Sequence, residues 1–407
     1  MTRNGIIIGG GASGLTAAIT AAEHGSQVTI IEHSAKLGKK ILSTGNGKCN
    51  LTNLFLDASC YRSDEEAFPM KVLQSFGPEQ TVKFFRKLGV LTTDRNGYVY
   101  PMSGQARTIS DALIDRAREL GVRVMKETEV VSISSEKGIF RVKTTGEEVK
   151  GDYIILACGS KAAKSTGSDG SGYKLAESLG HTLVKPVPAL VQLRCKGNYF
   201  PEISGVRIQA TVGIFQGKHF LASDTGELQL TDYGISGIPV FQVSRYASKL
   251  LDRKKPVTAV VDFFPETSEH EFFSLLQEQK KLLKERKAAG FLTGLFNKKL
   301  ADFFLKAAQI SPTLPIKDLS KHQISDLCRV VKSFEIAVNA TNSFEQAQIC
   351  AGGVKTTEVN PNTMESKKVK GLYIVGELLD VDGICGGYNL QWAWATGYLA
   401  GLRAAQN

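Results

Sequence analysis

The sequence predicts an α/β fold in which a Rossmann-type dinucleotide-binding unit is interrupted by a long insertion. First, a glycine-rich turn joins a buried apolar strand to an Ala- and Leu-rich helix within residues 4–24. Second, residues 370–407 return to the same order of strand, glycine turn and helix. Third, residues 189–348 have a different texture, with alternating strands and a lysine-rich helical stretch. A chain of 407 residues exceeds the size at which one core stops growing, so two or three domains are expected.

Composition narrows the class of protein. The hydrophobic fraction of 42% and the charged fraction of 22% are typical of soluble globular proteins. There is neither an apolar run of membrane-spanning length nor a signal-peptide pattern, which favours a cytoplasmic protein. The seven cysteines are scattered and form no CxxC pair, so we expect no disulfide framework, no metal site and no dithiol redox centre. A solvated lysine surface is the favoured explanation of the net charge of +10.

The N-terminal glycine turn carries the first functional indication. Gly9, Gly11 and Gly14 match the pattern GxGxxG between a strand and a helix. In this pattern one glycine permits the tight turn, one lets the backbone approach a pyrophosphate, and one lets helix and strand pack closely. The helix N-terminus, at Ala12 and Ser13, offers free N–H groups and a partial positive charge to the phosphates.

An acid follows at the spacing that a ribose requires. Glu32 ends the next β-rich run, 18 residues after Gly14. A carboxylate there accepts hydrogen bonds from ribose hydroxyls and disfavours a 2′-phosphate, so the site is expected to take FAD or NAD rather than NADP. A structural turn followed by a chance surface acid is the alternative, and the strand–turn–helix context argues against it.

The C-terminal pattern decides between these two cofactors. A strand ends in Gly376 and Glu377, Asp382 follows, and Gly387 opens a final helix. An NAD enzyme needs nothing from this region. In an FAD enzyme an acid can bind the ribitol, and a helix N-terminus can face the N1/O2 edge of the flavin. The pairing of both chain ends therefore predicts FAD.

Four runs of the sequence carry a resemblance to a known family. GGGASG, GKKILSTGNGKCNLTN, LACGS and the long run from AGGVKTTEVN to LQWAWATG resemble the BaiN-like bacterial FAD-dependent oxidoreductases, which include bile-acid Δ4,6-reductases and aminoacetone oxidase. The resemblance implies a two-dinucleotide-binding-fold FAD domain with an inserted β-barrel-like domain and a small helical domain. We place the FAD domain at residues 1–188 and 349–407, the β substrate domain at 189–265 and 332–348, and the helical cap at 266–331.

The resemblance also implies a set of FAD contacts beyond the glycine turn and Glu32. Lysine at positions 39 and 48, where arginine is common in the family, keeps the charge but loses the fork geometry. The implied contacts are Lys39, Lys40, Asn46, Gly47, Lys48, Cys49, Asn50, Val130, Ala157, Gly159, Gly376, Glu377, Asp382, Gly387, Tyr388, Asn389 and Leu390.

Catalytic residues are weakly indicated. Cys49 is either a reactive thiol or, as we favour, a packed side chain. Tyr388 is as suited to donating a proton as to packing. No histidine has a partner at motif spacing, and His181 is expected to lie at a helix C-terminus. The glycine-rich run 167–172 follows no adjacent strand, so NAD(P)H is expected to dock transiently rather than in a second Rossmann domain.

Three functions remain open at this point. The leading one is an NAD(P)H-dependent reductase that passes hydride from reduced flavin to an activated C=C bond of a hydrophobic substrate, as in 3-dehydro-bile-acid Δ4,6-reductases. The second is a small-amine oxidase of the aminoacetone oxidase type that uses O2. The third is an RNA-binding flavoprotein, which the lysine-rich stretch 280–287 disfavours because it contains no interleaved aromatic residues.

Overall fold

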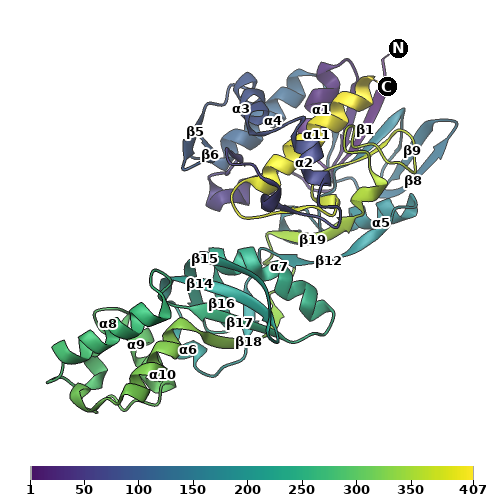
Figure 1. Ribbon diagram of the computed structural model, residues 1–407. Coiled ribbons are helices and arrows are strands. Elements are labelled where there is room, and N and C mark those ends of the chain that lie inside the picture. Colours follow the sequence, from purple (N-terminus) through teal and green to yellow (C-terminus); the bar gives the residue numbers. More distant parts are fainter. Residues whose placement is uncertain (1, 407) are drawn as a thin grey trace. The chain divides into compact units, whose positions relative to one another are not determined.

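The computed structural model describes residues 2–406, which form two compact units. Unit 1 runs to Pro186 and resumes at Gln348, and unit 2 covers Val187–Ala347. In Figure 1 unit 1 carries the purple, blue and yellow ends of the chain, whereas unit 2 is teal and green. The predicted fold class, an FAD-type α/β unit with an inserted barrel and helices, is confirmed.

A five-stranded parallel sheet forms the centre of unit 1. The apolar run Ile6–Ile8 occupies its middle strand and is buried on both faces, as continuous hydrophobic runs in parallel sheets are. The strands beside it come from distant parts of the chain. In spatial order they are β20 (Leu372–Ile374), β11 (Tyr153–Leu156), β1 (Asn4–Ile8), β2 (Gln27–Ile31) and β7 (Arg123–Met125).

The first and last helices pack directly on each other. Helix α1 (Ala12–Glu23) lies beside α11 (Tyr388–Gln406), the purple and yellow helices of Figure 1. A Cβ atom at Gly397 would lie 2.3 Å from the backbone oxygen of Ser13, and one at Gly401 would lie 2.4 Å from that of Ala17. The close approach therefore requires glycine, and it joins the two ends of the sequence.

Smaller sheets and helices complete unit 1. They form the antiparallel sheets β3-β6-β5 and β10-β9-β8 and the pairs β4–β21 and β12–β19. Their bounds are β3 (Thr52–Asn53), β4 (Tyr61–Arg62), β5 (Thr92–Arg95), β6 (Tyr98–Pro101), β8 (Val130–Glu136), β9 (Ile139–Thr144), β10 (Glu148–Gly151), β12 (Leu183–Ala189), β19 (Ile349–Val354), β21 (Asp382–Gly383), α2 (Phe68–Leu73), α3 (Pro78–Lys87), α4 (Ala106–Glu119) and α5 (Ser171–Ser178).

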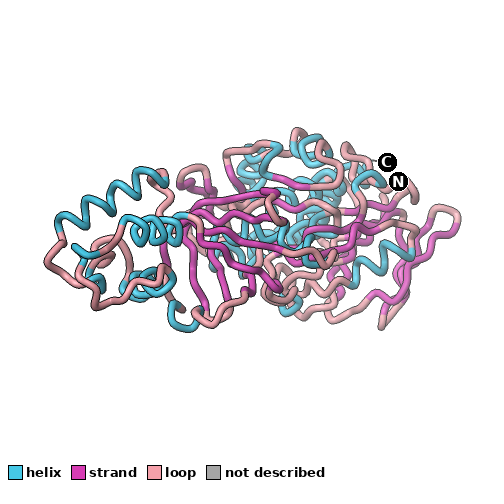
Figure 2. Tube along the Cα trace, turned by 60° about the horizontal axis from the view of Figure 1, so that its bottom comes forward, coloured by secondary structure: helices cyan, strands magenta, loops and turns pink. Residues whose placement is uncertain are grey.

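Unit 2 is a closed barrel with helices. Figure 2 colours all strands of the chain magenta and all helices cyan. The helical stretch predicted from the lysine-rich sequence forms α8 (Glu269–Leu282), α9 (Lys298–Ala307) and α10 (Lys321–Lys332). The barrel strands in spatial order are β13 (Leu193–Cys195), β16 (Gly234–Gly237), β15 (His219–Thr231), β14 (Arg207–Gln216), β17 (Val257–Asp262) and β18 (Phe334–Thr341). The other α-helices are α6 (Phe200–Ile203) and α7 (Ile238–Asp252).

One part of the strand prediction in unit 2 is wrong. Residues 189–265 were expected to form short strands, but they contain the 15-residue helix α7. Its buried side chains include Val240, Val243, Ala247 and Leu250, which recur at helical spacing. The strands before and after it suggested a further strand, whereas the helical spacing of the apolar side chains agrees with the observed helix.

The helices α8–α10 share the core of the barrel. Phe272 of α8 and Phe304 of α9 belong to the same cluster of buried side chains as Val261 of the barrel. These helices lie in the same compact unit as the barrel strands. The division of this unit into a β domain and a separate helical cap at 266–331 stays a prediction. Within residues 2–406, every helix is too short or too polar to cross a membrane.

Candidate functional site

The three glycines of the N-terminal turn have different surroundings. Gly9, at φ +107°, could not carry a Cβ atom, which would lie 2.4 Å from the Ala157 oxygen. A Cβ atom at Gly14 would lie 1.9 Å from the Gly9 oxygen. At Gly11 a Cβ atom would meet no described atom within 4 Å, and no side chain of residues 2–406 caps the helix that begins at Ala12. Two glycines are thus needed for packing, and the third leaves open space at a helix N-terminus, where a pyrophosphate fits.

Glu32 is held in a fixed orientation at the end of β2. Its Oε2 accepts a hydrogen bond from the Gly10 N–H at 2.8 Å, and its Oε1 accepts one from the Ser34 N–H at 2.7 Å. The Thr128 N–H donates to the Glu32 backbone oxygen, which brings the segment leading into Val130 to the same strand end. Because each carboxylate oxygen has a further lone pair, the buried side chain can still accept from ribose hydroxyls.

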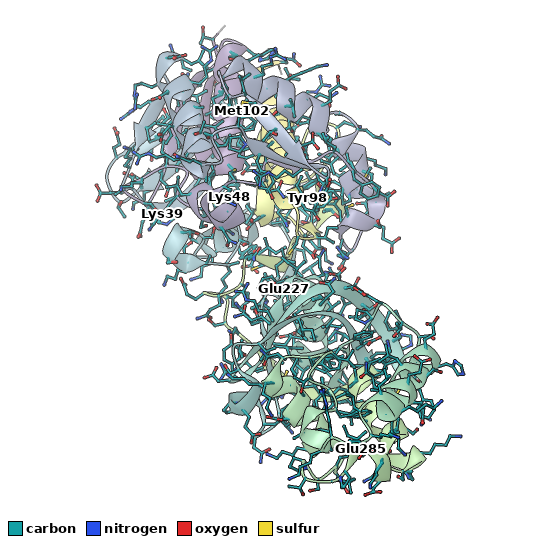
Figure 3. All side chains as sticks on the ribbon, turned by 90° about the vertical axis from the view of Figure 1, so that its left-hand side faces the viewer. Lys39, Lys48, Tyr98, Met102, Glu227 and Glu285 are labelled. Carbon is teal, nitrogen blue, oxygen red and sulfur yellow. The ribbon has the colours of Figure 1, made fainter. Side chains whose placement is uncertain are left out.

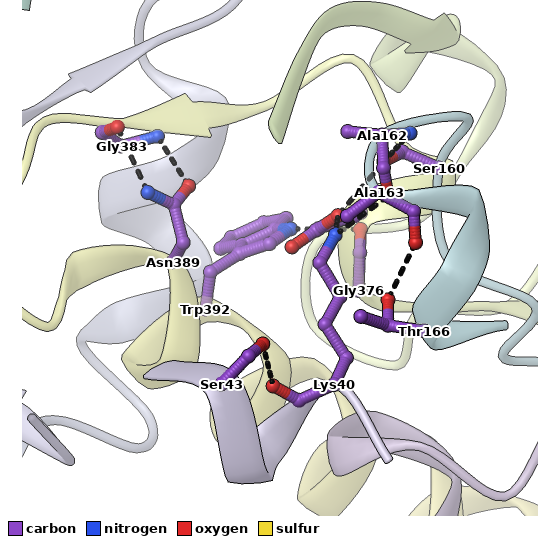
Figure 4. A network of polar contacts seen from close by, with 11 residues as sticks. Lys40, Ser43, Ser160, Ala162, Ala163, Thr166, Gly376, Gly383, Asn389 and Trp392 are labelled. Atoms are coloured by element: carbon purple, nitrogen blue, oxygen red, sulfur yellow. Dashed lines mark hydrogen bonds and ion pairs between the residues drawn. The ribbon is translucent and has the colours of Figure 1, made fainter. Parts of the chain in front are cut away.

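A polar network joins Glu377 to two other segments (Figure 4). Its Oε2 lies 2.7 Å from Lys40 Nζ and accepts a hydrogen bond from Ser160 Oγ at 2.8 Å. The indole N–H of Trp392 donates to the Gly376 oxygen at 3.1 Å. The network fixes the acid beside the start of α11 and uses the charge of Lys40 to do so. Ser160 was not predicted, because nothing in its local sequence distinguishes it from an ordinary loop serine.

The loop from Asn46 to Asn50 has an unusual backbone. Gly45, Asn46, Gly47 and Cys49 all have left-handed φ angles, of +55°, +53°, +82° and +56°. The Cys49 side chain is fully buried, and this burial raises the pKa of its thiol to about 12, against a weaker opposing hydrogen bond with Thr44. The thiol is therefore neutral at physiological pH, which favours packing over reactivity.

Asn50 and Gly387 bring an unsatisfied acceptor to the start of α11. Asn50 Oδ1 is buried and has no hydrogen-bond partner within residues 2–406. A Cβ atom at Gly387 would lie 2.9 Å from this oxygen and 2.8 Å from the backbone oxygen of Thr52. Buried polar atoms are nearly always paired, so the free oxygen indicates a ligand that donates a hydrogen bond here. A flavin ring carries such a donor, and these residues fit it.

Asn389 brackets the turn before α11 (Figure 4). Its Oδ1 accepts a hydrogen bond from the Gly383 N–H at 2.8 Å, and its Nδ2 donates to the Gly383 oxygen at 2.9 Å. The side chain thus binds the preceding strand β21, where Asp382 is buried, rather than capping N–H groups of its own helix. This geometry holds the Gly386–Gly387 turn in one conformation.

Tyr388 and Leu390 face the packed side of the same helix turn. The Tyr388 ring makes an edge-on contact with Tyr61 at a centroid distance of 5.8 Å. Burial, and then the neighbouring Cys60, raise the pKa of Tyr388 well above its usual value. The side chain is a poorer proton donor for this reason, and its surroundings favour packing. Leu390 is half-buried against the core of unit 1.

The remaining expected contacts divide into two groups. Ala157 and Gly159 lie at the end of β11, and the Ala157 N–H donates to the Ile8 oxygen at 2.8 Å, next to the glycine turn. Lys39 and Lys48 are exposed, and Lys48 lies in the Asn46–Asn50 loop (Figure 3).

In the described part of the chain, no group of three or more His, Cys, Asp or Glu side chains could hold a metal ion.

A pocket beside this loop was missed at the level of sequence. It has a volume of about 320 Å³ and is lined by Lys48 and by side chains of the β5–β6 hairpin. The hairpin turn is Asn96-Gly97, with both residues at positive φ. Asn-Gly between two β-rich runs is a strong hairpin signal, so this sequence could have revealed the hairpin but not its partners.

Comparisons with known proteins bear on the whole chain. The family model described as HI0933-like protein Rossmann domain matches residues 3–403. A 3-dehydro-bile acid Δ4,6-reductase of Clostridium scindens is 48% identical over 100% of both chains. A ribosomal RNA dihydrouridine synthase of Haemophilus influenzae is 29% identical over 98% of this chain and 97% of that protein. One of Escherichia coli is 28% identical over 97% and 96%.

Proposed function

This chain belongs to the HI0933-like family of Rossmann-domain proteins, and on that premise we propose that it reduces a C=C bond conjugated to a carbonyl group, with NAD(P)H as electron donor. The chain is an FAD-dependent oxidoreductase, and the resemblance to flavoproteins of the bile-acid reductase type is confirmed. The observation that carries the proposal is the identity of 48% over the full length of a Δ4,6-reductase.

Two parts of the site support this proposal, one for each half of the cofactor. The open space at Gly11 and the fixed carboxylate of Glu32 suit the adenosine and pyrophosphate half of the cofactor. The Gly387 turn and the unpaired Asn50 oxygen suit the flavin ring. When bound, the reduced flavin supplies the hydride. The N-terminus of α11 carries positive partial charge, which would stabilise negative charge on a flavin ring bound beside it.

The relatives share one chemical task. The name of a Δ4,6-reductase describes saturation of C=C bonds in a ring, and the name of a dihydrouridine synthase describes the same change in a uracil ring. In both rings the C=C bond is conjugated to a carbonyl group. Hydride adds to the carbon remote from the carbonyl and a proton adds to the adjacent carbon, so the product gains two hydrogens. The small-amine oxidase is not favoured, because none of these three relatives has such a name.

Anaerobic reduction of the purified holoenzyme tests the proposal. NADH or NADPH should bleach the flavin absorbance, and a 3-oxo steroid acid with a 4,6-diene should restore it in the absence of O2. Aminoacetone and other small amines serve as the matched control and should leave the oxidised spectrum unchanged. Bleaching by an amine, together with no response to either nicotinamide, would establish the oxidase instead.

Uridine in RNA is a second candidate substrate. The observation that favours it is the match of two ribosomal RNA dihydrouridine synthases over 97–98% of this chain. The same reduced holoenzyme can be mixed with unmodified ribosomal RNA, and dihydrouridine can be measured by mass spectrometry of nucleosides. Product from RNA with none from the steroid acid would replace the leading substrate class and leave the reaction type unchanged.

A further inference from the structure

The pocket beside the Asn46–Asn50 loop is built on one face of the β5–β6 hairpin. In this antiparallel pair Arg95 lies opposite Tyr98, and Thr93 lies opposite Tyr100. Alternate residues of a strand share a face, so these four side chains project from the same side of the hairpin. All four line the pocket, together with Lys48 and Met102. Figure 3 shows Lys48, Tyr98 and Met102 on this part of unit 1.

The charge of the pocket has one sign. Lys48 and Arg95 are exposed, and neither forms an ion pair within residues 2–406. Thr93, the two tyrosines, a proline, a methionine and a glycine make up the rest of the lining, which contains no carboxylate. Asp94 lies between Thr93 and Arg95 but belongs to the opposite face of the strand, and its carboxylate accepts from the Gly97 N–H. The lining therefore combines two unpaired cations with aromatic and apolar surface.

The pocket adjoins the expected flavin site at two points. A Cβ atom at Gly386 would lie 2.9 Å from the ring of Tyr98, so this ring packs on the turn that precedes α11. A Cβ atom at Gly45 would lie 3.9 Å from the ring of Tyr100, which places that ring against the loop. The Asn53 side chain, on the strand next to β6, donates to the Gly386 oxygen at 3.3 Å. The hairpin is thus attached to the same turn that we assign to the flavin ring.

We propose that this pocket binds the anionic group of the substrate, a carboxylate carried on a flat apolar ring system, through Arg95 and the two tyrosine rings. This inference rests on the proposed function and names the substrate class of that site. A guanidinium can bind a carboxylate with two parallel hydrogen bonds, and aromatic faces accommodate flat rings. The volume of about 320 Å³ lies within the range for small-molecule sites.

Binding to the oxidised holoenzyme tests the inference without turnover. The probes are a 3-oxo-4,6-diene steroid carboxylic acid and its methyl ester, which differ in the negative charge and one methyl group, and perturbation of the flavin absorbance reports the Kd. The variant Arg95→Gln should raise the Kd of the acid about tenfold and leave that of the ester unchanged, as expected for loss of a charged hydrogen bond. Arg86→Gln, at an exposed position of α3 outside the pocket, is the matched control and should behave like the wild type.

The outcomes separate this inference from the proposed function. Equal effects of Arg95→Gln on acid and ester, or failure of the wild type to bind the acid, would overturn the pocket assignment. A rise in the KM for NADH or NADPH, with an unchanged Kd for the acid, would overturn it also, because the cation would then serve the donor. Arg95-dependent binding of an acid that the enzyme never reduces would leave the pocket standing and refute the proposed reaction.

Discussion

The two glycine turns of unit 1 differ in which neighbouring atoms exclude a larger side chain. In the turn Gly9–Gly14, a Cβ atom at Gly14 would conflict with the Gly9 oxygen inside the turn, and one at Gly9 would conflict with Ala157 after β11, whereas Gly11 faces open space. In the turn Gly386–Gly387, the conflicts are with Tyr98 and Thr52, which lie more than 280 residues earlier in the chain. The first turn therefore combines a conflict within the turn at Gly14, a contact with the end of β11 at Gly9, and one position left open for a ligand. The second exists only because distant segments meet there.

The largest expected effect separates the packing glycines from the ligand glycine. Gly14→Val places a branched side chain against the Gly9 oxygen, 1.9 Å from the Cβ position, and this contact has no flexible side chain to move. We expect a loss of stability on the order of 4–5 kcal/mol or more, and little soluble protein. Thermal melting and soluble yield measure it. A well-folded Gly14→Val protein would mean that the turn is looser than the structure shows.

Gly11→Val should instead remove the flavin and spare the fold. Its backbone is extended, so valine fits locally, but the side chain enters the space assigned to the pyrophosphate. We expect flavin occupancy to fall more than tenfold while the circular dichroism of the apoprotein stays that of the wild type. The flavin released from the wild type should be FAD and not FMN. Full occupancy in this variant would place the phosphates elsewhere.

At the second turn, Asn389→Leu tests whether the hydrogen bonds between Asn389 and Gly383 affect the flavin potential or only the stability of the fold. Two hydrogen bonds to Gly383 would be lost, at a cost of about 1–3 kcal/mol in stability. Because the Asn389 side chain holds the turn that we assign to the flavin ring, the redox potential of the flavin should fall as well, and reduction should slow more than substrate binding weakens. Potentiometry gives the redox potential of the flavin, and melting curves on the same preparation give the stability. A lower melting temperature with an unchanged potential would leave Asn389 a purely structural residue.

The smallest expected effect concerns a polar contact between two distant segments of unit 1, which involves no glycine. His181 follows α5, and its imidazole contacts Glu358 and Ser366 of the C-terminal segment, each at 2.9 Å. Burial lowers the pKa of His181, against the opposing influence of Glu358. Burial acts to raise the pKa of Glu358, but hydrogen bonds from Lys368 and Thr182 outweigh it and lower the pKa to about 2.

Both shifts make the folded state bind fewer protons than the unfolded state. The contribution of His181 is present above its unfolded pKa of about 6.5 and is lost as the pH falls below that value. The contribution of Glu358 is lost as the pH falls from about 4.5 towards 2. For a chain of 407 residues, we expect the melting temperature to drop by about 1 °C per kcal/mol lost on acidification. His181→Asn should flatten the change between pH 7 and 5, and an unaltered slope would assign it to other groups.

The parts of this fold that the sequence predicted are those that local patterns encode. The strand, turn and helix around Gly11 and the acid at Glu32 follow from periodicity and spacing alone. Ser160 and the pocket around Arg95 were missed because their roles arise from contacts between segments far apart in the chain. Helix α7 was missed for a different reason, because neighbouring strands biased the interpretation of a segment with clear helical spacing.

The packing of α11 on α1 has a consequence for synthesis. Ser13 leaves the ribosome long before Gly397, and the whole of unit 2 is translated between them. At about 5–20 residues per second, the N-terminal half of the cofactor site waits for tens of seconds with its packing surface uncovered. Strand β20 is also missing from the edge of the parallel sheet during this interval. We therefore expect the flavin to bind only after the last helix is complete, and a chain truncated before Gly397 to be purified without flavin absorbance.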